Sequence, residues 1–124
     1  MKALVARYRE RGLLGNLYFI SVTKPLVERS VLMEMHDAHL EYQHHLEESG
    51  ILFAAGPLLN EAGGPSGESM NIYRVSSLAA AQEIVDNDPM HRTKRRSAEL
   101  RPWVMNEGSF KLELSMSAKK ISFS

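Results

Sequence analysis

The stretch LYFISV at residues 17–22 decides the fold, because it is short, rich in aromatic and β-branched residues, and soon followed by a proline. These features are typical of a β-strand. Since alternate side chains of a strand point to opposite faces, Leu17 and Phe19 lie on one face, and Tyr18 and Ile20 on the other. Both faces are apolar, so another part of a protein must cover each of them.

Downstream of this strand, residues 28–49 lack glycine and proline and are rich in Glu, Leu, Met and His. This composition predicts one long helix, which Gly50 is placed to end. At 100° per residue, one sector of this helix collects its apolar side chains: Val31, Leu32, Met35, Ala38, Tyr42 and Leu46. His39 lies inside that sector.

Three further strands and a second helix complete the expected order. The run at 51–55 predicts a second strand, closed by Gly56-Pro57 and a Gly/Pro/Ser-rich loop at 60–67. Residues 70–75 alternate as a third strand. Ser76 or Ser77 can cap a second helix from residue 78 to about 87, before Pro89. Residues 98–105 predict a fourth strand with Pro102 at an edge or bulge.

The expected order β-α-β-β-α-β is that of the ferredoxin-like α+β sandwich, a four-stranded antiparallel sheet with two helices on one face. The other sheet face is best covered by the same face of a second copy, so we expect a homodimer. The domain spans residues 16–106, between an N-terminal extension at 1–15 and a C-terminal extension at 107–124. In the latter, residues 111–116 alternate like an extra strand, which extends the sheet or swaps to a partner.

Composition excludes several classes of function. The chain has 124 residues and no cysteine, which removes disulfides, thiolate metal sites and cysteine nucleophiles. No apolar run approaches the ~20 residues that a bilayer requires, and the N-terminus lacks a secretory apolar segment, so we expect no membrane partner and a cytoplasmic location.

The net charge is zero, but basic and acidic residues are unevenly distributed. Residues 28–68 carry one basic and eight acidic side chains, whereas residues 91–124 carry eight basic and three acidic ones. The one dense basic run, at 91–96, holds no aromatic residue, which argues against nucleic acid and favours a solvated loop or helix end. The opposite charges of the two segments can also meet across a subunit interface.

Four of the five histidines lie on the expected long helix, and His39 alone faces inward. A histidine there can act as a general base near neutral pH, or be a core residue held by a hydrogen bond. His36 lies three residues away, a spacing that can chelate a metal, but no HExxH motif occurs on this helix. We therefore expect no metal.

Asp88 ends the second helix, where a carboxylate often only caps a turn. The topology, however, places both helices side by side on one sheet face, so His39 can come near Asp88 and form an acid/base pair. Gly56 and Pro57 can let the backbone approach a ligand or simply make a turn, and Ser69 can supply a hydroxyl group. No nucleotide-binding or serine-hydrolase motif occurs.

The chain resembles the YCII-related (YciI-like) family in several segments that occur in order. The matching segments are His39-Leu40, Glu48 to Leu52, Ala55 to Leu58, Ser77 to Ala81, Asp88-Pro89 and Arg101 to Trp103. The resemblance implies a dimeric α+β barrel and a pocket around His39 and Asp88. The chain departs from the family pattern where His36-Asp37-Ala38 replaces the usual Arg-Pro before the histidine, and where Met90 replaces an aromatic residue.

The resemblance also implies a function, because one branch of the family eliminates chloride from chlorinated hydroxylated aromatics. We expect a cofactor-free lyase or isomerase that acts on a small cyclic or aromatic, possibly halogenated, acid. His39 and Asp88 are the catalytic candidates, and Gly56, Pro57, Ser69 and His36 the substrate-binding candidates. A non-catalytic ligand-binding or interaction module is the alternative, and a haem or monooxygenase role, as in other dimeric ferredoxin-like proteins, is a third.

Overall fold

The computed structural model describes residues 1–124, which divide into two units. One unit is Leu17–Trp103, and the other combines Met1–Asn16 with Val104–Ser124. The first unit holds almost all of the expected ferredoxin-like domain.

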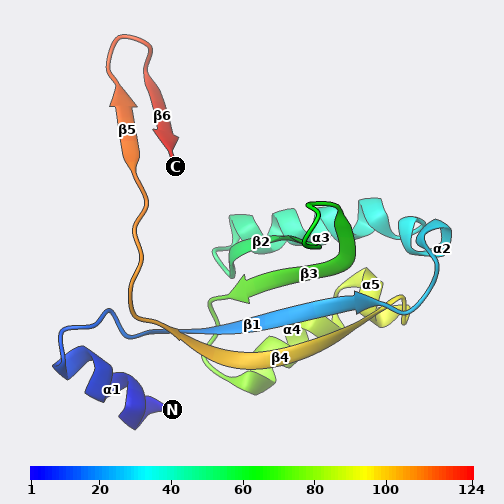
Figure 1. The fold of residues 1–124 in the computed structure, drawn as a ribbon, viewed down its shortest axis with the longest axis horizontal. Coiled ribbons are helices and arrows are strands. Elements are labelled where there is room, and N and C mark those ends of the chain that lie inside the picture. The colour runs from blue at the N-terminus through cyan, green and yellow to red at the C-terminus, as the bar shows by residue number, and fades with distance from the viewer. The chain divides into compact units, whose positions relative to one another are not determined.

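The sheet of the first unit has four strands in the order β2-β3-β1-β4 (Figure 1). These strands are β1 (Asn16–Pro25), β2 (Leu52–Leu59), β3 (Pro65–Tyr73) and β4 (Arg96–Met105). The β1 and β3 strands pair antiparallel, with Phe19 opposite Tyr73 and Thr23 opposite Ser69. The element order and this strand order confirm the predicted ferredoxin-like α+β class.

Both long helices pack on the Tyr73 face of the sheet. They are α3 (His36–Glu48) and α4 (Leu78–Asp86), accompanied by the short helices α2 (Arg29–Met33) and α5 (Pro89–Arg92). Leu46 of α3 and Val85 of α4 form the core cluster with Tyr73. The Tyr42 hydroxyl of α3 also donates a hydrogen bond to the Ile84 carbonyl of α4 at 2.6 Å. This layer brings the end of α4 beside α3.

The prediction of one long helix is wrong, because the chain turns at Glu34 and Met35 between α2 and α3. Arg95, far along the chain, donates from Nε to the Val31 carbonyl at 2.8 Å and from Nη2 to Glu34 at 2.8 Å. These bonds satisfy the exposed end of α2. The placement of Ala38 in the apolar sector is also wrong, since its side chain is exposed.

The prediction that Gly56-Pro57 ends the second strand is also wrong. The β2 strand continues through Gly56, opposite Met70, and Pro57, opposite Ser69, as far as Leu59. A proline lacks a backbone N–H and is tolerated here because β2 is an edge strand. The β3 strand accordingly begins at Pro65, earlier than expected.

The second helix follows its prediction closely. Ser77 caps α4, its hydroxyl oxygen accepting from the Ala80 N–H at 3.0 Å. The chain then turns before Pro89, which occupies the first turn of the additional helix α5. A proline suits that position, because the N–H it lacks would have no partner there.

The sheet face opposite the helices is apolar. Ile20 lies opposite Ile72 on it, and Val22 lies opposite Met70. The ring of Tyr18 lies 4.9 Å from that of Phe53 and 5.9 Å from that of Trp103, measured between centroids. This face agrees with the prediction that the Tyr18 and Ile20 face of β1 is apolar, whereas the helix-covered face also carries the buried polar residues Ser21 and Thr23.

The other unit contains helix α1 (Lys2–Glu10) and strands β5 (Leu112–Ser115) and β6 (Lys120–Phe123). The extra strand expected at 111–116 therefore forms, but it pairs with β6 in a separate two-stranded sheet. Neither α1 nor β6 was expected from the sequence. No helix of the chain is long and apolar enough to span a membrane.

Candidate functional site

His39 and Asp88 are in direct contact in the structure. His39 Nδ1 lies 2.8 Å from Asp88 Oδ2 and 3.0 Å from Oδ1. The aspartate side chain is almost fully buried, with 8% of its surface exposed, and the histidine side chain is 24% exposed. The carboxylate can only accept, so Nδ1 carries the hydrogen and Nε2 is the nitrogen left free in the neutral ring.

Asp88 is held in place by its own local structure. It is the N-cap of α5, and its Oδ1 accepts from the Met90 N–H at 2.9 Å. Pro89 at the next position keeps Asp88 in an extended conformation, which suits a cap. Asp88 can therefore cap α5 and bind His39 at the same time, because Oδ1 accepts from the Met90 N–H while Oδ2 lies closest to His39 Nδ1.

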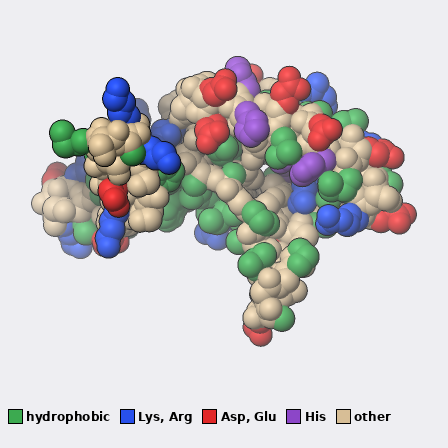
Figure 2. Space-filling model, turned by 90° about the horizontal axis from the view of Figure 1, so that it is seen from above, with side chains coloured by type: hydrophobic (Ala, Val, Ile, Leu, Met, Phe, Trp, Pro, Cys, Tyr) green, Lys and Arg blue, Asp and Glu red, His purple; other side chains and the backbone are tan.

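A cavity of about 840 Å³ lies between α3 and the β2–β3 hairpin, and His39 lines it. The other residues that the sequence suggested for substrate binding line the same cavity: His36, Gly56, Pro57 and Ser69. Figure 2 shows a hollowed face on which histidine side chains lie among acidic and apolar ones, with a basic side chain beside the hollow.

The part of the sheet that forms one wall of the cavity is polar, although it lies on the face that the helices cover. Gln43 Nε2 donates to Asn71 Oδ1 at 2.8 Å, and Asn71 Nδ2 donates to Ser21 Oγ at 3.1 Å. Ser21 Oγ lies 3.4 Å from the Tyr73 hydroxyl. Burial raises the pKa of Tyr73 to about 12, so its hydroxyl stays protonated at neutral pH. The chain of hydrogen bonds therefore leads from the cavity wall into the core.

The charge of Asp88 influences several neighbouring groups. Burial and then the Asp88 carboxylate raise the pKa of Tyr42 to about 12. Burial also lowers the pKa of His91, although Asp88 opposes this shift. His91 is therefore favoured in its neutral form, and His39 is the histidine bonded to the carboxylate.

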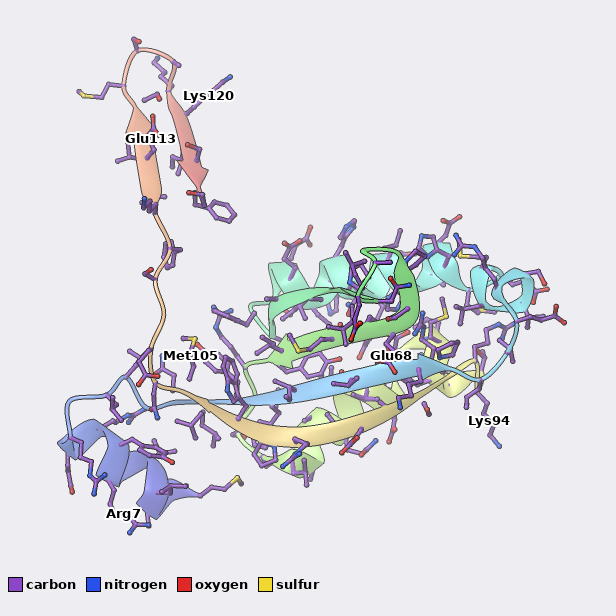
Figure 3. All side chains as sticks on the ribbon, in the orientation of Figure 1. Arg7, Glu68, Lys94, Met105, Glu113 and Lys120 are labelled. Atoms are coloured by element: carbon purple, nitrogen blue, oxygen red, sulfur yellow. The ribbon has the colours of Figure 1, made fainter.

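Arg96 is a cavity residue that the sequence did not reveal. The expectation of a solvated loop or helix end at residues 91–96 is wrong for Arg96, which lines the cavity, whereas Lys94 extends away from the sheet (Figure 3). Arg96 Nη1 donates to the Gly67 carbonyl at 2.9 Å and to Thr23 Oγ1 at 3.3 Å. Arg96 is the first residue of β4, and its inward direction follows from the alternation of that strand.

No group of three or more His, Cys, Asp or Glu side chains is arranged to hold a metal ion. His36 and His39 both line the cavity, but the bond from Nδ1 to Asp88 leaves His39 only Nε2 for any other partner. The site is therefore best described as a histidine–aspartate pair at the wall of a mixed polar and apolar cavity.

Comparison with known proteins identifies relatives of this chain. A family model described as the YCII-related domain matches residues 8–104. No curated protein matches the chain.

Several solved chains match, and the one described here shares the fold at low sequence identity. It is 5-chloro-2-hydroxyhydroquinone dehydrochlorinase from Burkholderia phenoliruptrix AC1100, in complex with 2,5-dihydroxybenzoquinone. The two chains are 22% identical, with a TM-score of 0.59 over 71% of this chain and 93% of the other. The similarity confirms the α+β architecture.

Proposed function

Because the chain belongs to the YCII-related family, we propose that it is a small lyase or isomerase in which His39, oriented by Asp88, moves a proton on a small cyclic or aromatic acid. The observation that carries this proposal is the bond between His39 Nδ1 and Asp88 at the wall of the cavity. A carboxylate bonded to Nδ1 fixes the tautomer and stabilises the imidazolium that forms when Nε2 accepts a proton.

The proposed chemistry begins when Nε2 of His39 removes a proton from a hydroxyl group or an acidic carbon of the substrate. In a lyase, the electron pair released by this step expels a leaving group such as chloride. In an isomerase, the imidazolium returns the proton to another carbon. Neither route changes the net oxidation state of the substrate, so no redox cofactor enters the proposal.

The cavity suits a small ring substrate in size and lining. Its volume of about 840 Å³ lies within the usual range for small-molecule sites, roughly 300–1,000 Å³. Ser69 can donate a hydrogen bond, and Gly56 and Pro57 offer a wall with little side-chain bulk. The structural relative acts on a chlorinated hydroxyhydroquinone, which favours halogenated hydroxyaromatics as the first compounds to test.

We also propose a homodimer in which the open sheet faces of two copies meet. The face carries paired apolar residues, Ile20 with Ile72 and Val22 with Met70. On the same face the Tyr18 ring lies 5.9 Å from that of Trp103. Burying this face against its own copy would remove it from water and close two sheets into a barrel.

The test is a turnover screen of lactones and halogenated hydroxyaromatics with the wild type and with His39→Gln. We expect turnover of at least one compound and a loss of about 10²-fold or more in kcat/KM for His39→Gln. His45→Gln is the matched control, because His45 is exposed on the same helix and does not line the cavity.

Full activity in His39→Gln would refute the proposed role of this histidine. If compounds bind the cavity but none turns over, the protein is instead a ligand-binding module.

A further inference from the structure

The guanidinium of Arg96 is a half-buried cation without an ion-pair partner. The ion pairs of the chain are Lys24–Glu68, His39–Asp88 and Arg95–Glu34, and Arg96 is in none of them. Burial lowers the pKa of Arg96 from its usual value, and the Asp88 charge opposes this effect. An arginine nevertheless stays charged in a protein, so a partly desolvated one is stabilised by an anion.

The hydrogen bonds of Arg96 leave most of its donors free. Both bonds within the chain use Nη1, toward the Gly67 carbonyl and Thr23 Oγ1. A guanidinium carries five N–H groups, which leaves three for other acceptors. No buried polar side-chain atom of the chain lacks a partner, so the unpaired Arg96 nitrogens are accessible. Because Arg96 lines the cavity, a ligand there can reach them.

A second donor lies beside Arg96. Thr23 Oγ1, which accepts from Arg96, lies 2.7 Å from Ser69 Oγ. When Thr23 gives its hydrogen to Ser69, the Ser69 hydroxyl hydrogen becomes free for a ligand, and Ser69 lines the cavity. Two carboxylates line the cavity, Glu47 of α3 and Glu68 of β3. Glu68 lies 3.6 Å from Lys24, which partly neutralises it.

We infer that Arg96 and Ser69 form an anion-binding subsite in this cavity, and that its ligand is a small ring compound bearing a carboxylate or an ionised hydroxyl group. The inference rests on the proposed function, since it takes the cavity as the substrate site. A carboxylate can accept two parallel bonds from a guanidinium, which fixes the ring plane as well as the charge. The subsite thus orients the ring relative to His39 on the same cavity.

The experiment compares charged probes with neutral probes of the same shape. Dissociation constants are measured by calorimetry for salicylate against salicylamide, and for gentisate against gentisamide. A hydrogen bond to a charged group is stronger than one to a neutral group by about 1–2 kcal/mol, so we expect at least one carboxylate to bind wild type about 5- to 30-fold tighter than its amide. Arg96→Met should abolish this preference, and Arg96→Lys should retain part of it.

Two controls make the result specific. Arg92→Met removes the same charge from an exposed residue outside the cavity, and should leave the preference unchanged. Ser69→Ala should weaken carboxylate binding several-fold without affecting the binding of the amides. If Arg96→Met does not fold, Ser69→Ala tests the subsite in its place. Equal binding of acids and amides, no binding of either, or a preference that persists in Arg96→Met would overturn the inference.

The same assay on His39→Gln separates this inference from the proposed function. A carboxylate preference that persists in His39→Gln, while no turnover is found for the wild type, supports the subsite and refutes the catalytic proposal. Turnover that depends on His39, but without any preference for acids over amides, refutes the subsite alone.

Discussion

Replacing Asp88 by asparagine tests the pairing of His39 and Asp88 most directly, because the substitution preserves shape and removes one charge. The carboxylate makes two kinds of contact: Oδ1 accepts from the Met90 N–H at 2.9 Å, and Oδ2 lies 2.8 Å from His39 Nδ1. If the amide oxygen keeps the cap, the amide NH₂ faces Nδ1. The NH₂ group of the asparagine and the N–H at His39 Nδ1 are both donors, so they would repel each other unless the imidazole changes tautomer.

The expected result of Asp88→Asn is therefore a His39 ring with its hydrogen on Nε2 instead of Nδ1. The free lone pair moves to Nδ1, where it accepts from the amide, and Nε2 can no longer accept a proton from a substrate. We expect kcat/KM to fall about 10²-fold or more, as for loss of a general base. Asparagine is as good an N-cap as aspartate, so the capping contribution to α5 should be retained.

The stability change follows from the same geometry. A hydrogen bond to a charged group contributes about 1.5–3 kcal/mol and a neutral one about 0.5–1.5, so the free energy of unfolding should fall by about 1–2 kcal/mol. Asp88→Ala also loses the cap, which adds about 1 kcal/mol. Urea unfolding at neutral pH measures both variants against wild type.

The assay for the tautomer is a long-range ¹H–¹⁵N NMR spectrum of the histidine rings, recorded at a pH where they are neutral. His39→Gln assigns the His39 signals. If His39 keeps its hydrogen on Nδ1 in Asp88→Asn, or already carries it on Nε2 in the wild type, the inferred pairing is refuted.

Three further predictions concern pH, helix capping and assembly. Because burial lowers the pKa of His91 in the folded protein, the unfolded chain gains a proton first as the pH falls below about 6.5. Between pH 7.5 and 5.5, wild type should thus lose more unfolding free energy in urea than His91→Gln, and an equal loss would contradict this. Ser77→Ala should cost about 1 kcal/mol in the same assay, since Ser77 caps α4, whereas exposed Ser76→Ala should cost little. Ile20→Asp should convert the proposed homodimer into monomers by light scattering, and an unchanged mass would argue against an interface on that face.

The architecture could be predicted from the sequence, because local signals agree along the chain. The LYFISV run at 17–22 became the central part of β1, and the serine pair before residue 78 marked the start of α4. Period-2 and period-3.6 patterns depend only on residues close together in the sequence, so they can be recognised without a structure. The element order then implied that the helices lie together, which placed His39 and Asp88 on one side of the sheet.

Contacts between distant residues decided the rest. The break between α2 and α3 is stabilised by Arg95, more than sixty residues away in the chain. Strand β2 passes through Gly56-Pro57 because it pairs with β3 and lies at the sheet edge, where a missing N–H is tolerated. Neither fact has a local signal.

The residues of the site, too, could be predicted from the sequence only in part. Sequence pattern singled out His39 from four helical histidines, because it alone lay in the apolar sector. It could not distinguish Arg96 from its basic neighbours. In the run at 91–96 the first two residues end a helix, the next three turn and the last begins a strand. Whether a charged side chain faces solvent or a cavity depends on the register of β4 in the folded sheet, and only the tertiary structure determines that register.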